Sequence, residues 1–130
     1  MGWNDPDVYY QPEKFGLTVV AEIEYSTGNY EFDTRVVWRH SSGLLLTARD
    51  AGCSCPSPFE DYTSLEAVEI FDYEEIEVEV AKEMSYSWGD IKPLDAANFL
   101  NKTRRASKDA VTPAEIDLSI RRQIQAALTS

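Results

Sequence analysis

Two cysteines, Cys53 and Cys55, carry the most reactive side chains of this sequence, and a single residue separates them. Together with His40 and Asp50 they could supply a zinc site of mixed ligands. Structural zinc sites usually take four Cys or His ligands in two spaced pairs, whereas this chain has three such residues in all. We therefore predict no metal and no cofactor, and we expect a reduced, packed pair of cysteines.

A cysteine nucleophile is the second chemistry that these residues suggest. Cys53 or Cys55 would need a base within hydrogen-bond reach, and His40 is the sole histidine. The distance between His40 and the cysteines depends on the register of the strands that carry them. No flanking sequence resembles a cysteine-hydrolase signature, and the chain has no Gly-rich phosphate loop, GxSxG or HExxH motif. We therefore predict that the protein is not an enzyme.

Acidic residues dominate the charge, which is −11 net. Residues 1–100 hold 20 acidic and 6 basic residues, whereas residues 101–130 hold 3 and 6. Direct binding of nucleic acid needs a basic surface, so we do not expect it of the main body. Residues 59–83 hold 10 acids and one base, which favours a solvated face over a mimic of nucleic-acid phosphates. The candidates for partner binding in this run are Glu74, Glu75, Glu77 and Glu79.

Residues 52–62 separate two kinds of pattern, strands before and helices after. Pro56 and Pro58 fix φ and remove backbone donors, so neither a strand nor a helix can continue through them. Aromatic and acidic residues follow at once, and we expect this corner to take part in partner binding. Its candidates are Cys53, Cys55, Pro56 and Phe59.

Three strands over residues 16–49 are predicted before the corner, joined by turn-forming residues at 26–29 and 41–43. Period-two alternation indicates half-buried strands over residues 16–25 and 30–40. In the first strand the alternation places on one face Leu17, Val19, Ala21, Ile23 and Tyr25. The third strand, residues 44–49, starts with an apolar run and is expected to be covered on both sides. Residues 1–15 predict an irregular arm whose aromatic rings pack onto the domain.

Two or three helices are predicted after the corner. Thr63 and Glu66 match a capping box. Residues 73–86 fit a strand, by alternation of Glu with Ile and Val, and also a helix, by a recurrence every four residues from Ile76. We favour the helix. Pro93 then opens a helix to about residue 105, and residues 106–111 form a linker. The inner face of that helix is predicted to hold Leu94, Ala97 and Leu100, with Phe99 alongside.

A last helix over residues 113–128 is predicted from the start signal at residues 112–115. Its apolar stripe contains Ile116, Ile120, Ile124 and Leu128. The stripe belongs to the core, or it docks onto a partner or a second copy, which would make a homo-oligomer. Together these patterns predict an α+β fold: a three-stranded antiparallel meander packed against two to three helices, in one domain over residues 16–130.

Three segments of the sequence carry a resemblance: WNDPDVYY at residues 3–10, PEKFGL at 12–17 and, most distinctively, GCSCPSPFEDYTSL at 52–65. They resemble a family of small uncharacterised proteins encoded by actinobacterial phages, mycobacteriophages among them, and the likeness covers roughly residues 3–70. It implies a phage accessory protein in the cytoplasm of an infected bacterium. With no apolar run of ~20 residues and no export signal, we expect no membrane partner. We predict a non-enzymatic protein that binds a host or phage protein. The alternatives are an acidic mimic of nucleic acid and a virion component.

Overall fold

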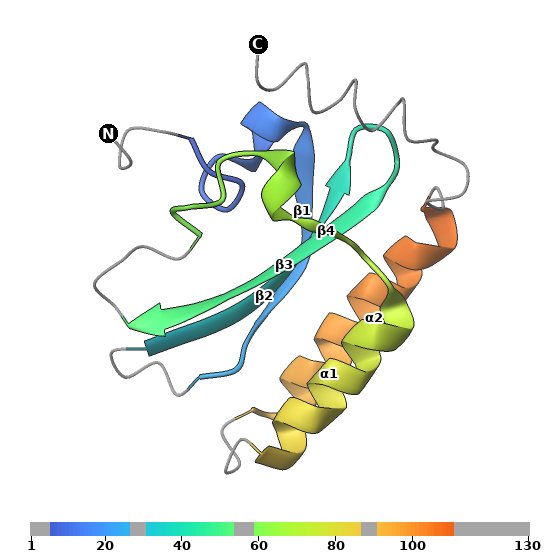
Figure 1. Ribbon diagram of the computed structural model, residues 1–130. Coiled ribbons are helices and arrows are strands. Elements are labelled where there is room, and N and C mark those ends of the chain that lie inside the picture. The colour runs from blue at the N-terminus through green and yellow to red at the C-terminus, as the bar shows by residue number, and fades with distance from the viewer. Residues whose placement is uncertain (1–5, 27–30, 54–58, 87–90, 111–130) are drawn as a thin grey trace.

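The computed structural model describes residues 6–26, 31–53, 59–86 and 91–110. They form a four-stranded antiparallel sheet in the order β1-β2-β3-β4 with two α-helices beside it (Figure 1). The predicted α+β class is confirmed, and so is the meander of the first three strands. The elements are η2 (Pro12–Phe15), β1 (Leu17–Glu24), β2 (Glu31–His40), β3 (Leu45–Cys53), η3 (Leu65–Ala67), β4 (Glu69–Ile70), α1 (Tyr73–Tyr86) and α2 (Pro93–Asp109), where η denotes a 3-10 helix.

A β-bulge in β1 changes the side chains that share a face. The register with β2 shifts between Val19 and Ala21, so one extra residue lies between two consecutive pairs. Leu17 therefore packs on one face of the sheet, while Ala21 and Ile23 pack on the other. The predicted single face is wrong for this reason, and Val19 is 45% exposed.

The strand β3 is longer than predicted, and a short fourth strand follows it. β3 runs to Cys53 because its last residues pair with the start of β2, with Gly52 opposite Phe32. The predicted capping box at Thr63 does not start an α-helix. Ser64 caps the short η3 instead, where its hydroxyl accepts from the Glu66 N–H at 3.3 Å. The chain then forms β4, which sequence patterns did not indicate.

Residues 73–86 form the helix α1, so the prediction that we favoured for this segment is confirmed. The Asp72 carboxylate accepts from the Glu74 N–H at 3.0 Å, as an N-terminal cap does. Ile76 and Val80, one turn apart, are buried against the sheet. The spacing of these two buried residues therefore indicates the helix correctly, whereas the alternation of glutamates, which fits a strand, does not.

The helix α2 presents a different face to the core from the one predicted. Its buried residues are Ala96, Phe99, Thr103 and Ala106, whereas Leu94 is 69% exposed. The helix also continues to Asp109, so the predicted linker begins too early. In Figure 1, α1 and α2 lie side by side along one face of the sheet, and α2 contacts β1.

Both faces of the sheet are covered. On the helix-covered face, α1 and α2 pack against residues such as Val37 and Leu45. On the arm-covered face, residues 6–16 and 59–68 enclose Trp38, and Phe15 of the arm is buried there. The Val8 N–H joins the two covering segments by donating to the Tyr62 carbonyl at 3.0 Å. The described part of the arm therefore packs onto the sheet.

Candidate functional site

The residues considered for zinc or thiol chemistry do not come together. Cys53 pairs with Glu31 at the start of β2, whereas His40 is the last residue of that strand. At about 3.3 Å per residue, the two positions are about 30 Å apart. Asp50 instead accepts from the Phe59 N–H at 2.8 Å. Cys55 lies outside the described residues, and within the described part no three His, Cys, Asp or Glu side chains gather as metal ligands.

His40 has a local structural role at its own end of the sheet. Its Nδ1 accepts from the Ser42 N–H at 3.0 Å and lies 2.9 Å from the Ser42 hydroxyl. Burial lowers the pKa of His40, which favours the neutral ring. The backbone of Gly16 lies against this ring, since a Cβ at that position would be 3.3 Å from Nε2. Gly16 also has φ 71°, a conformation that favours glycine.

The predicted partner-binding residues divide between core and surface. Phe59 is fully buried and stacks on Tyr9 with ring centroids 5.0 Å apart, so it is not available to a partner. Its φ of 63° is uncommon for a residue with a side chain. Glu74, Glu75 and Glu77 are exposed on α1. Pro56 and the stripe of residues 116–124, with its predicted helix, lie outside the described residues.

Glu79 differs from the other glutamates because it turns inward and binds two arginines of the sheet. We call this group the α1 ion-pair network; it consists of Asp33, Arg35, Arg49, Glu79 and Glu83. Arg35 binds both carboxylate oxygens of Glu79, one of them through Nε at 2.9 Å. Arg49 binds both oxygens of Asp33 at 2.7 Å and lies 3.4 Å from Glu79 and 3.1 Å from Glu83.

Tyr25 completes the network from β1's end. Its hydroxyl donates to Glu79 at 2.7 Å, and the Arg49 guanidinium lies 4.6 Å from its ring centroid. Burial alone would raise the pKa of Glu79, but hydrogen bonds from Arg35 and Tyr25 outweigh it and lower that pKa. A carboxylate held in its charged form by two arginines is a poor proton donor near neutral pH. The network therefore fixes α1 on the sheet.

The outer edge of β3 is open next to this network. β4 pairs only with Leu46 and Thr47, so residues 48–53 have no neighbouring strand on that side within the described part of the chain. We call residues 48–53 the open β3 edge. The Leu45 carbonyl accepts from the Phe71 N–H on this side, and the direction of backbone groups alternates along a strand. The backbone groups of Arg49, Ala51 and Cys53 therefore point outward.

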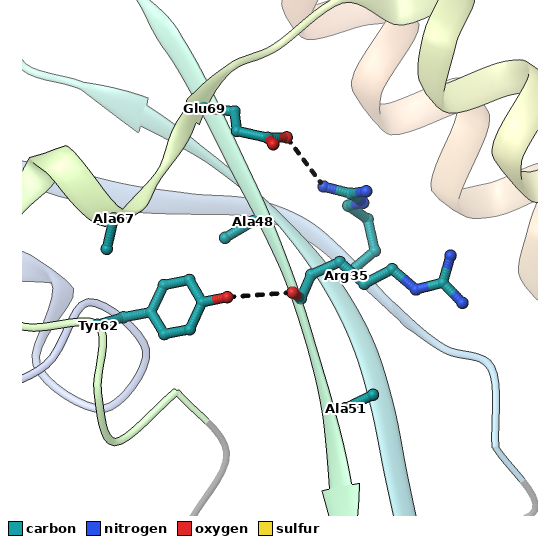
Figure 2. A pocket seen from close by; sticks show the side chains of 7 residues that line it. Arg35, Ala48, Ala51, Tyr62, Ala67 and Glu69 are labelled. Carbon is teal, nitrogen blue, oxygen red and sulfur yellow. Dashed lines mark hydrogen bonds and ion pairs between the residues drawn. The ribbon is translucent and has the colours of Figure 1, made fainter.

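A hollow of about 380 Å³ lies along the open β3 edge. It is lined by Arg35, Ala48, Arg49, Ala51, Tyr62, Ala67 and Glu69. Figure 2 shows the Tyr62 hydroxyl next to β3, where it donates a hydrogen bond to the Arg49 carbonyl at 3.2 Å. It also shows the ion pair between Glu69 and Arg35. The hollow lies where β4 would continue, because the chain before Glu69 turns away into η3. Three alanine side chains are too small to fill the space.

Sequence reasoning missed this site, although one signal was available. The open β3 edge combines Ala48, Ala51 and Gly52, and alanine and glycine are both depleted in strands. Small residues within a strand mark a place where something else can approach the backbone closely. The predicted third strand ends at residue 49 and the predicted corner begins at Gly52, so the three small residues do not fall within one predicted element.

Fold and edge together define an α+β domain whose antiparallel sheet is covered on both faces and open along one edge. A family described as a domain of unknown function, DUF7574, matches residues 6–110, and the chain belongs to that family. No curated protein and no solved structure matches the chain. In the described residues, neither α-helix has the length and apolar character needed to span a bilayer.

Proposed function

We propose that this protein is a non-enzymatic binding module that engages another protein through the open β3 edge. The observation that carries the proposal is the length of β3 beyond its last pair with β4. The outward Arg49 carbonyl accepts from the Tyr62 hydroxyl, and the outward groups of the other residues have no strand partner within the described part of the chain. Such an edge is a template on which an extended segment can form backbone hydrogen bonds. A side chain of that segment would enter the adjoining hollow.

The covering of the sheet supports a rigid binding surface. The α1 ion-pair network holds Arg35 and Arg49, and these two arginines also line the hollow. On the other side, Tyr62 packs against Phe59 with centroids 5.1 Å apart, and Phe59 is fully buried. The residues around the edge are therefore fixed before a partner arrives, which reduces the entropy lost on binding. The resemblance to phage proteins favours a host or phage protein as the partner, in the bacterial cytoplasm.

Affinity capture from phage-infected cells tests this proposal with two matched proline variants. Ala51→Pro removes an outward N–H from the open β3 edge, where proline is tolerated because no ladder bond is lost. Val19→Pro removes an outward N–H from β1, the opposite edge of the sheet. Val19 pairs with Trp38, whose backbone groups point toward β3, so the backbone groups of Val19 point away from β2. Proteins captured by the wild type and by Val19→Pro, but lost with Ala51→Pro, are the expected result. Equal capture by all three would contradict the proposal.

Mimicry of nucleic acid is the second candidate, and the exposed side of α1 favours it. Glu74, Glu75 and Glu77 are exposed there, and carboxylates spaced along a helix can attract a protein that binds phosphates. Glu79 and Glu83 are excluded from this surface by their arginine partners. A triple change of the exposed glutamates to glutamine abolishes capture if the protein is a mimic. It leaves capture intact if the open β3 edge is the binding surface.

A further inference from the structure

We infer that the segment which occupies the open β3 edge is an extended, basic segment of another protein, added as a strand in line with β4. This inference rests on the proposed function and specifies the chemistry of the partner. Three properties of the edge carry it: the direction of its backbone groups, the shape of the adjoining hollow and the charge around both.

The backbone geometry accommodates a short strand. The open β3 edge has the length of six strand residues, which is about 20 Å. Arg49, Ala51 and Cys53 direct their backbone groups outward, and the Arg49 carbonyl already accepts a hydrogen bond from Tyr62. β4 ends where the hollow begins, so an added segment would continue the line of β4 along β3. The geometry thus favours an extended peptide over a helix.

The hollow selects the side chains that the added strand places against it. Ala48 and Ala51 contribute methyl groups from β3, and Ala67 contributes one from η3. Side chains of a strand alternate between its two faces, so Ala48 and Ala51, three positions apart, lie on opposite faces of β3. The hollow therefore meets side chains that the added segment places on either face. The other lining side chains are polar or charged, so the hollow of about 380 Å³ suits side chains of small or medium size next to the three methyl groups.

The charge around the edge selects the remaining side chains. Two bases line the hollow, Arg35 and Arg49. They are ion-paired with four carboxylates, those of Asp33, Glu69, Glu79 and Glu83. Of these carboxylates, Glu69 lines the hollow itself, and its side chain is 75% exposed. Lysine or arginine in the added segment would therefore face an excess of carboxylates.

The same charge argues against a second copy of this chain. Two copies joined through their open β3 edges would bring two identical acidic rims together, and each chain carries a net charge of −11. Like charges placed face to face oppose such a pairing. The same carboxylates attract a strand from a basic partner and repel a second copy of this chain.

Titration of the full-length chain with a synthetic peptide tests the inference. The probe alternates lysine with alanine or valine, and the control peptide has glutamate in place of lysine. We expect the lysine peptide to shift the backbone NMR signals of Arg49 and Ala51, and the glutamate peptide to leave them unchanged. Ala51→Pro should weaken binding about tenfold or more, because backbone hydrogen bonds are lost and the ring obstructs the strand. Val19→Pro should bind as the wild type does.

Two further variants separate the contributions of charge and shape. Glu69→Gln should weaken the lysine peptide about two- to fivefold, as expected for a single charge at the rim of an interface. Ala67→Leu fills the hollow from η3 without changing the backbone of β3, and it should also weaken binding about tenfold. This variant keeps the test decisive if Ala51→Pro lowers the midpoint of urea unfolding.

Five outcomes would overturn the inference. The first is that the glutamate peptide binds as well as the lysine peptide. The second is that Ala51→Pro and Ala67→Leu both bind the lysine peptide normally. The third is a dimer in sedimentation that Ala51→Pro dissociates, which would make a second copy the occupant. The fourth is protection of the Arg49 and Ala51 amides from hydrogen exchange in the free monomer, which would mean that the chain covers its own edge. The fifth is that neither peptide binds. If the peptides fail while cell capture still depends on Ala51, the inference falls and the proposed function stands; if capture is also insensitive, both fall.

Discussion

The two faces of the sheet are stabilised by different chemistry. The arm-covered face is held by aromatic and aliphatic contacts, with Trp38 and Phe59 fully buried and their rings 6.1 Å apart. The helix-covered face has an apolar part near Val37 and a charged part, where the α1 ion-pair network lies between β2, β3 and α1. One face therefore depends on removing apolar area from water, and the other depends on matching charges as well.

The covering segments on the two faces are also attached to the sheet in different ways, on either side of the open β3 edge. Covering segments on the arm side come from residues far apart in the chain, and they exclude water by packing. On the other side, two arginines fix α1 through Glu79 and Glu83. Between the two covers, residues 48–53 of β3 have no neighbouring strand on their outer side within the described part of the chain. The comparison predicts that the two faces respond differently to truncation, to loss of charge and to acid.

The largest effect is expected from Phe59→Ala on the arm-covered face. The ring contacts Tyr9, Trp38 and Tyr62. Its removal therefore leaves a cavity among these three rings that small shifts of the rings do not fill. The free energy of unfolding should fall by about 3–5 kcal/mol, as for other buried aromatic residues replaced by alanine. Urea unfolding followed by circular dichroism measures this loss. A loss under about 1 kcal/mol would mean that Phe59 is not packed as described.

The second effect, Glu79→Gln, tests the helix-covered face. The change leaves Arg35, whose side chain is 10% exposed, without its main carboxylate partner. The free energy of unfolding should fall by about 2–3 kcal/mol, because a buried charge loses a charge-assisted hydrogen bond. Glu75→Gln is the matched control on the same helix, where the side chain is exposed, and it should change stability by less than about 0.5 kcal/mol. Equal effects of the two changes would show that the network does not hold α1.

Sequence patterns predicted the fold class and most of the secondary structure because these depend on local periodicity. The alternation of β2 is an example: Val36 and Trp38 lie on one face and Arg35 and Val37 on the other. Patterns failed where a tertiary feature changed the period. The bulge near Val20 places Leu17 and Ala21 of β1 on opposite faces of the sheet. The packing of Phe99 against the sheet determines which face of α2 is buried.

The candidate site was less predictable because it depends on pairing between distant segments. The register that separates His40 from Cys53 follows from the way in which β2 and β3 align, and no single strand specifies that alignment. The inward turn of Glu79 depends on Arg35 and Arg49, which lie 44 and 30 positions earlier in the sequence. The run of glutamates alone could not show which of its members meets an arginine. The two-residue β4 that leaves the edge open has too few residues to show a period.

The smallest effect is expected from pH, and it distinguishes the two faces by the range in which each responds. Burial on the arm-covered face lowers the pKa of His40 below its ordinary value of 6.5. The unfolded chain therefore binds a proton at a higher pH than the folded chain does, and stability should fall as the pH drops below about 6.5. On the helix-covered face, the lowered pKa of Glu79 causes loss of stability only below its ordinary value of 4.5. Glu24, whose carboxylate accepts from Ser26 and Thr34, adds to that lower range.

Thermal unfolding between about pH 8 and pH 5 isolates the contribution of His40, because both glutamates stay ionised over most of that range. His40→Gln removes the titrating group and keeps an oxygen that can accept from the Ser42 N–H. The variant should therefore lose the decline in stability that the wild type shows below about pH 6.5. Glu79→Gln should be less stable than the wild type across this range and should keep the decline. A decline that persists in His40→Gln and disappears in Glu79→Gln would reverse the assignment of the two responses, and the contrast between the faces would then need a different cause.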